Sequence, residues 1–219
     1  MPYAKEKKIF TVYQEDLLTA FVFLACLILL TFFPTDGASQ KITSGLVFLF
    51  IAPILYLKLV LKKGLADFGW QLGDWKKGLV FSAVCFVPAL LISFVLFRYT
   101  PFLKEYQLPL AAINNFWYFI FYELAIVGIF VALYEVFFRS FAMFYLSVKT
   151  GIYSVLYQFF LFFLFFWVTG NLDWNIIPLL IVAFFSGLVT FKSRSLLYSF
   201  ATSLFFLIIF DSLVIKFTH

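Results

Sequence analysis

Seven apolar stretches, each close to the length of a membrane-crossing helix, dominate this sequence. They are separated by short polar segments and cover roughly 17–33, 44–61, 78–97, 113–133, 152–168, 176–191 and 196–215. About 20 apolar residues in a helix are needed to cross about 30 Å of hydrocarbon. The pattern therefore predicts an all-α, polytopic transmembrane helix bundle with about seven spans.

The composition supports a membrane protein. The 219-residue chain is 64% hydrophobic and 12% charged, with a mean hydropathy of +1.04. Soluble domains average about 45–50% apolar and about 25% charged residues. We expect a polar N-terminal segment over 1–16 and one transmembrane domain over 17–216. The first apolar stretch is long enough to span, and "FFPTDG" after it offers no small-x-small cleavage site, which indicates an uncleaved helix.

The distribution of basic residues predicts the orientation. With the N-terminus inside, 12 of the 16 lysine and arginine residues fall on the inner side. The four on the outer side are Lys41, Arg98, Lys104 and Lys216. Basic residues favour the cytoplasmic side, so we expect a cytoplasmic N-terminus. This topology explains the net charge of +5, and no basic stripe suggests nucleic-acid binding.

The sequence lacks the motifs that several common kinds of catalytic and metal sites require. Cys26 and Cys85 both lie in apolar stretches without CxxC spacing, so we interpret them as small buried hydrophobes. No GxxxxGK, HExxH or GxSxG motif occurs. The sequence predicts no metal and no cofactor.

Four ionisable residues fall within or beside the apolar stretches. Glu135 and Arg139 are four residues apart, so they lie on one helix face and can pair directly. The plain interpretation is a structural ion pair near the inner interface, with Arg139 reaching toward water. Glu123 and Asp211 both fall in the outer half of their helices. They either line a common polar site, or Glu123 is protonated and hydrogen-bonded inside the bundle.

The stretch "YEVFFRSF" (134–141) resembles the EExxxR signature of the CPBP intramembrane proteases, the CAAX protease and Abi family. Typical members have E-E-x-x-F-R-G-F here, at the end of a membrane helix. "FGWQLGDWKKGL", "KTGIYSVL", "FSGLVTF" and "SRSLLYSFATS" resemble the family's neighbouring segments in the same order. The resemblance covers about residues 65–207 and implies a CPBP-like core in the cytoplasmic membrane of a prokaryote.

The family's chemistry uses two glutamates of this motif and two later histidines, which activate the attacking water. This chain has Tyr134 in place of the first glutamate, and an ungapped count places Trp167 at the first histidine. The second histidine falls near Thr202 or Ser203. The only histidine, His219, ends the sequence. The resemblance therefore implies a degenerate, catalytically inactive site.

Three functions remain open at this point. The first is a non-catalytic, CPBP-like scaffold or accessory subunit, with other integral membrane proteins and lipid as partners. The second is an active intramembrane protease that uses Glu123, Glu135 or Asp211 in a non-standard site. The third is a small transporter or lipid-handling protein, although the sequence shows no paired broken helices of the inverted-repeat type.

Overall fold

The computed structural model describes residues 2–218, and it describes side chains from residue 14 onward, except that of residue 38. Every regular element in this described part is a helix, and six helices are long and apolar enough to cross a membrane. The predicted all-α, polytopic membrane bundle is therefore confirmed. The six helices are Gln14–Phe32, Ser39–Val60, Trp75–Tyr99, Phe116–Thr150, Trp174–Ser193 and Leu196–Thr218.

The predicted fifth span is shorter than the others. It forms α10 (Tyr153–Val168), an apolar helix of 16 residues. At 1.5 Å per residue it extends about 24 Å, less than the about 30 Å of hydrocarbon. The structure thus has seven apolar helices, as the sequence predicts, and six of them have spanning length.

The chain forms two compact units that divide between Gly64 and Leu65. The first unit contains α1 (Pro2–Phe32) and a second helix made of α2 (Ala38–Gly45), α3 (Ala52–Leu55) and two π-helical stretches, Leu46–Ile51 and Tyr56–Val60. Thr19 and Tyr56 share a hydrogen bond of 2.8 Å between their hydroxyls, which joins the two helices. The prediction of one domain over 17–216 stays a prediction.

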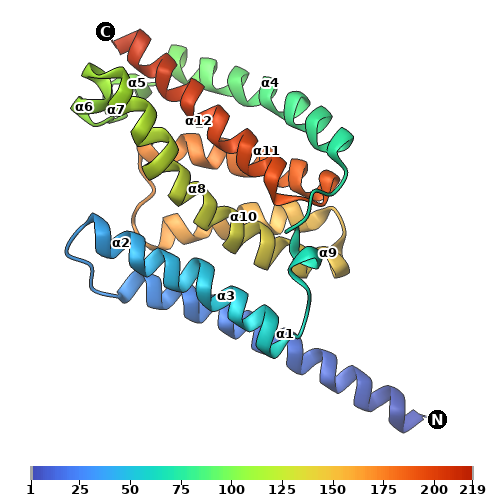
Figure 1. Ribbon diagram of the computed structural model, residues 1–219. Helices are drawn as coiled ribbons and strands as arrows, with labels where there is room; N and C mark the ends of the chain where they lie inside the picture. Colours follow the sequence, from blue (N-terminus) through green and yellow to red (C-terminus); the bar gives the residue numbers. More distant parts are fainter. Residues whose placement is uncertain (1, 219) are drawn as a thin grey trace. The chain divides into compact units, whose positions relative to one another are not determined.

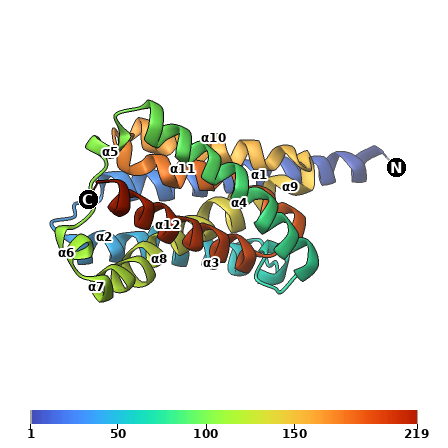
Figure 2. The ribbon, with the colours of Figure 1, turned by 90° about the horizontal axis from the view of Figure 1, so that it is seen from above.

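The second unit is a helix bundle centred on α11 (Ile177–Ser193). Helix α11 packs against α4 (Trp75–Tyr99), α12 (Leu196–Thr218) and α10. Both ribbon views show α4, α11 and α12 side by side (Figures 1 and 2). The short helices α5 (Phe102–Glu105) and α6 (Leu110–Asn114) follow α4.

A single long helix carries most of the predicted site residues. It runs without a break over Phe116–Thr150, as α7 (Phe116–Phe121), α8 (Gly128–Tyr134) and α9 (Phe144–Thr150) joined by π-helical stretches Tyr122–Val127 and Glu135–Met143. It ends at Gly151, whose φ of +57° suits glycine and turns the chain into α10.

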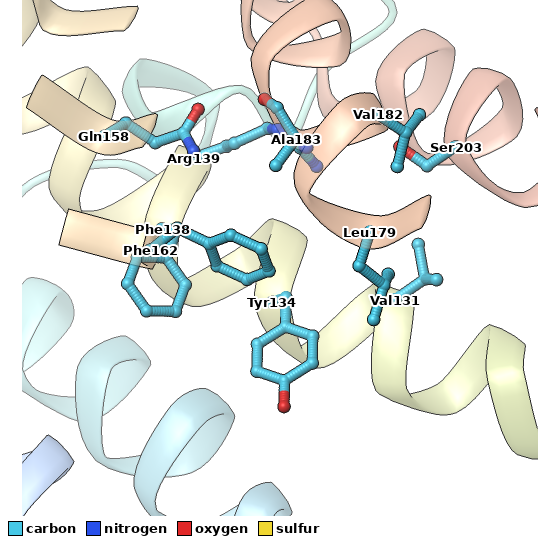
Figure 3. Close-up of a pocket in the computed structure, with 10 residues that line it drawn as sticks. All are labelled: Val131, Tyr134, Phe138, Arg139, Gln158, Phe162, Leu179, Val182, Ala183 and Ser203. Carbon is cyan, nitrogen blue, oxygen red and sulfur yellow. Dashed lines mark hydrogen bonds between the residues drawn. The ribbon is translucent and has the colours of Figure 1, made fainter. Parts of the chain in front are cut away.

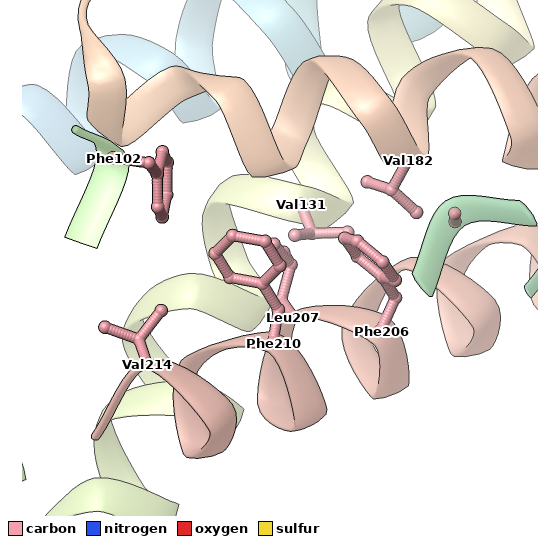
Figure 4. Packing of buried hydrophobic residues seen from close by; sticks show 8 residues of the cluster. Phe102, Val131, Val182, Phe206, Leu207, Phe210 and Val214 are labelled. Atoms are coloured by element: carbon pink, nitrogen blue, oxygen red, sulfur yellow. The ribbon is translucent and has the colours of Figure 1, made fainter. Parts of the chain in front are cut away.

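The apolar core of the second unit lies between α4, α8, α11 and α12 (Figure 4). Phe206 and Phe210 of α12 are fully buried, and Phe102 of α5 closes one end of the cluster. The rings of Phe102 and Phe210 meet edge to face at 5.4 Å. This core holds α12 in register against the long helix.

The start of α12 is also fixed by the backbone. The amide of Leu196 donates to the carbonyl of Gly69 at 2.9 Å, and the amide of Asp74 donates to the carbonyl of Ser193 at 2.8 Å. A side chain at Gly73 would meet the Ser193 carbonyl at 2.2 Å, so only glycine fits there. The segment before α4 therefore sets the rotation with which α12 enters the bundle.

Candidate functional site

The structure brings Glu135 and Arg139 together as an ion pair inside the second unit. Oε1 of Glu135 contacts Nη1 of Arg139, and the two side chains are 2% and 6% exposed. The carboxylate also accepts a hydrogen bond from Ser199 at 2.7 Å and one from Ser203 at 2.9 Å. Three donors from two helices therefore surround one carboxylate.

The guanidinium of Arg139 reaches α11 rather than the interface. Its Nη2 donates to Oγ of Ser186 at 2.5 Å and to the carbonyl of Ala183 at 3.3 Å. Only Nε of this side chain has no partner among the described residues. The expectation that Arg139 extends toward water is therefore wrong: the side chain is buried and bridges to a second helix.

Helix geometry explains why both serines meet Glu135. Ser199 and Ser203 are four residues apart on α12, so they lie on one face of the helix. Ser199 has no exposed surface and Ser203 is 1% exposed. Of the two, only Ser203 was predicted from the sequence, although the spacing of the two serines was a usable signal for Ser199.

A small cavity borders this cluster. Its volume is about 10 Å³, close to the minimum for a single water molecule. Figure 3 shows its lining. The lining residues are Val131, Tyr134, Phe138, Arg139, Gln158, Phe162, Leu179, Val182, Ala183 and Ser203. Its polar side chains come from three helices, but no polypeptide segment fits into it.

Tyr134 stands where the resemblance places the first glutamate, and aromatic rings enclose it. Its ring meets Phe138, Phe162 and Phe166, with centroid distances of 6.2, 5.3 and 5.7 Å. Figure 3 shows its hydroxyl directed away from Arg139. Tyr134 therefore contributes apolar packing to the cavity rather than a base.

Trp167 lies outside the site. It is 63% exposed near the end of α10 and does not line the cavity. Gln158 of the same helix lines the cavity instead, nine residues earlier. Nine residues are 2.5 turns, so the two side chains lie on opposite faces of α10. Thr202, the other position considered for the second histidine, bonds to Ser82 of α4 at 2.7 Å.

Gln158 is a polar residue that the sequence analysis missed. It is 1% exposed, and its Oε1 accepts no hydrogen bond from the described residues. It packs over Gly187 of α11, where an added Cβ would lie 2.7 Å from Oε1. A lone amide within the apolar stretch "YSVLYQFFLFF" was the signal that could have identified it.

Glu123 and Asp211 form a second polar site near the other end of the long helix. Both are buried, at 0% and 3% exposure, and the π-helical stretch Tyr122–Val127, which carries Glu123, packs against α12, which carries Asp211. The hydroxyl of Tyr106, from the segment between α5 and α6, donates to Oδ1 of Asp211 at 2.7 Å. Burial raises the pKa of Tyr106, and the negative charge of Asp211 raises it further, so this hydroxyl stays protonated.

The chemistry available at Glu135 is limited by its partners. Its carboxylate oxygens already accept from Arg139, Ser199 and Ser203, three of the about four hydrogen bonds that a carboxylate can accept, and its pairing with the guanidinium makes it a weaker base. No group of three His, Cys, Asp or Glu side chains that could hold a metal ion occurs among the described residues. His219, the only histidine, lies outside the described residues.

An open apolar groove runs between α4 and α12 on the same unit. Its volume is about 820 Å³. Its walls include Leu79, Ala83, Val87, Ala201 and Phe205. At one end the helices touch, because Gly78 lies against the ring of Tyr198. The bond between Ser82 and Thr202 then ties the two helices together beside the groove.

The fold and these sites define an integral membrane protein with two buried polar clusters. No family model, curated protein or solved structure matches the chain. The resemblance to the CPBP proteins therefore stays a prediction.

Proposed function

We propose that this chain is a non-catalytic membrane protein with a CPBP-like core, acting as a scaffold or accessory subunit of a membrane protein complex. In this proposal it resides in the cytoplasmic membrane of a prokaryote with its N-terminus in the cytoplasm. The observation that carries the proposal is the space beside Glu135. A cavity of about 10 Å³, bordered by aromatic rings, has no room for the backbone of a substrate.

The hydrogen bonding of Glu135 gives independent support. Peptide hydrolysis needs a base next to the attacking water and donors aimed at the developing oxyanion. Here the carboxylate and the guanidinium bind each other and serine hydroxyls instead. Such a cluster stabilises the contacts between helices and presents no group to a substrate.

The groove between α4 and α12 is the docking site we propose for a transmembrane helix of a partner protein. It lies on two helices of spanning length, so it lies at membrane depth. Ala83 and Ala201 are small and exposed in its walls, which permits close approach of another helix backbone. Large apolar side chains, Val87 and Phe205, flank them and offer contact area.

Copurification in mild detergent tests this proposal. The unmodified chain should retain a stoichiometric membrane-protein partner, and Ala83→Trp or Ala201→Trp should release it by filling the groove. Leu91→Trp is the matched control, because Leu91 is 61% exposed on α4 and does not line the groove. Absence of any stoichiometric protein partner, or lipid as the only bound component, contradicts the scaffold. A partner that remains bound to both groove variants contradicts this docking site.

A further inference from the structure

Glu123 and Asp211 come from different helices yet meet at the same depth. Glu123 is seven residues from the start of the helix Phe116–Thr150, and Asp211 is seven residues from the end of α12. Each is therefore about 10 Å along its helix from the same end of the bundle. The π-helical stretch Tyr122–Val127 that follows α7 packs against α12.

If both carboxyls were ionised, this site would have too few hydrogen-bond donors for its acceptors. Asp211 accepts from Tyr106, but neither oxygen of Glu123 receives a hydrogen bond from a donor group of the described residues. The ion pairs in this part of the chain, of Lys63, Lys77 and Arg139, all involve other acids. The stretch that carries Glu123 packs against α12, where the carboxyl of Asp211 is the polar group that acts on Glu123.

Two carboxyl groups can hydrogen-bond only when a proton lies between them. Ionised carboxylates are acceptors only, whereas a protonated carboxyl also donates. Two adjacent buried negative charges without a cation would be strongly destabilising. A single proton satisfies the donor requirement of the pair and leaves one negative charge.

The remaining groups around the pair are neutral phenols. Tyr106 bonds to Asp211, and Tyr122 adjoins Glu123 in the chain. No lysine or arginine faces the pair from the described part of these helices. The single charge that remains is stabilised by the Tyr106 hydroxyl.

We propose that Glu123 and Asp211 form an intramembrane proton-binding site, in which the two carboxyls share one proton and Tyr106 stabilises the remaining charge. The site is independent of the proposed scaffold function. Tyr106 also connects the site to the segment outside the membrane helices, because its ring stacks on that of Phe102 with a centroid distance of 4.9 Å. Gln107, next in the chain, donates its amide to Asn175 at 2.9 Å.

Infrared spectroscopy of the purified full chain in detergent tests this directly. At neutral pH the unmodified protein should show the C=O stretch of a protonated carboxyl, which Glu123→Gln should remove. Glu105→Gln is the control, because Glu105 is an exposed carboxyl in the same region and should leave the band unchanged. A spectrum without a protonated-carboxyl band, or with a band that Glu123→Gln leaves intact, overturns the proposal.

Thermal unfolding against pH gives a second measurement that does not depend on one variant. The stability contributed by the shared proton is complete below about pH 4, where the unfolded carboxyls are also protonated, and it declines as pH rises until the folded site loses the proton and holds two buried negative charges. The melting temperature of the unmodified protein should therefore fall as pH rises. Glu123→Gln and Asp211→Asn should each abolish that fall, since an amide donates permanently. If a folded variant shows a fall in melting temperature as large as that of the unmodified protein, the shared proton is contradicted.

Discussion

Arg139 links the carboxylate of Glu135 to the hydroxyl of Ser186, and so joins the long helix to α11. Ser199 and Ser203 bind the same carboxylate from α12. One buried cluster therefore connects three helices of the bundle. Its geometry suits a structural junction, and this suggests measurable consequences for stability.

Replacing Arg139 by Ala should destabilise the protein by about 3–5 kcal/mol, because it leaves the buried Glu135 carboxylate without a counter-charge. We expect a lower melting temperature in detergent and reduced accumulation in the membrane. Arg98→Ala is the control, since Arg98 is exposed at the end of α4. Equal melting temperatures for the two variants would show that the pair does not hold the helices together.

Ser199→Ala should cost about 1–3 kcal/mol, because it removes a hydrogen bond to a buried charged group. Ser212→Ala on the same helix serves as the comparison. Ser212 is exposed, and its hydroxyl bonds only to the carbonyl of Ile208 in its own helix. Chemical or thermal unfolding should separate the two variants clearly, and equal stability would contradict the role assigned to Ser199.

Gly187→Ala should destabilise the contact between α10 and α11. The added methyl group would lie 2.7 Å from Oε1 of Gln158 and 3.1 Å from Cγ1 of Val155, so the helices must shift. Overpacking of this kind typically costs about 1–3 kcal/mol. Gly37→Ala, where nothing lies within 4 Å, removes only the preference for glycine at the N-cap of α2 and should cost less than Gly187→Ala in the same unfolding measurement. A neutral Gly187→Ala would show that Gln158 can move away freely.

The helices could be predicted from the sequence because their signal is length. An apolar stretch near 20 residues has few alternatives in a membrane. Length was a weaker guide to the shortest helices. The stretch 152–168 forms α10, which falls short of spanning length, whereas the still shorter stretch 176–191 lies in a helix of spanning length.

Of the contacts at the site, the sequence could predict only those between residues of the same helix. Glu135 and Arg139 are four residues apart, so helical periodicity alone places them together. Contacts between helices depend on rotation about each axis, which the apolar pattern leaves open when all faces are apolar. The ungapped count therefore selected Trp167, whereas the turn at Gly151 and the rotation of α10 present Gln158.

Restoring two motif residues should not create a metal site. Tyr134→Glu with Trp167→His adds a carboxylate and an imidazole, but residue 167 lies on the face of α10 opposite Gln158 and is exposed. Zinc needs three or four ligands converging at about 2 Å. Elemental analysis of the purified double variant should find no stoichiometric zinc. One tightly held equivalent would show that these positions converge after all.

A variant that lacks both charges of the Glu135–Arg139 pair best distinguishes a scaffold from an enzyme. Glu135→Gln alone would leave Arg139 buried and unpaired, so its loss of function would be ambiguous. Glu135→Gln with Arg139→Met removes the carboxylate and the guanidinium together, and neutral replacements of buried ion pairs are often tolerated. The level of the variant in the membrane serves as the control for folding.

The decisive measurement is complementation of a strain that lacks this protein by the Glu135→Gln/Arg139→Met variant, with accumulation and partner binding measured in parallel. A scaffold needs neither charge for chemistry, so we predict that the variant restores most of the wild-type phenotype and keeps its partners. A variant that accumulates normally and binds its partners, yet fails to complement, would contradict the scaffold and indicate a reaction that depends on the Glu135 carboxylate.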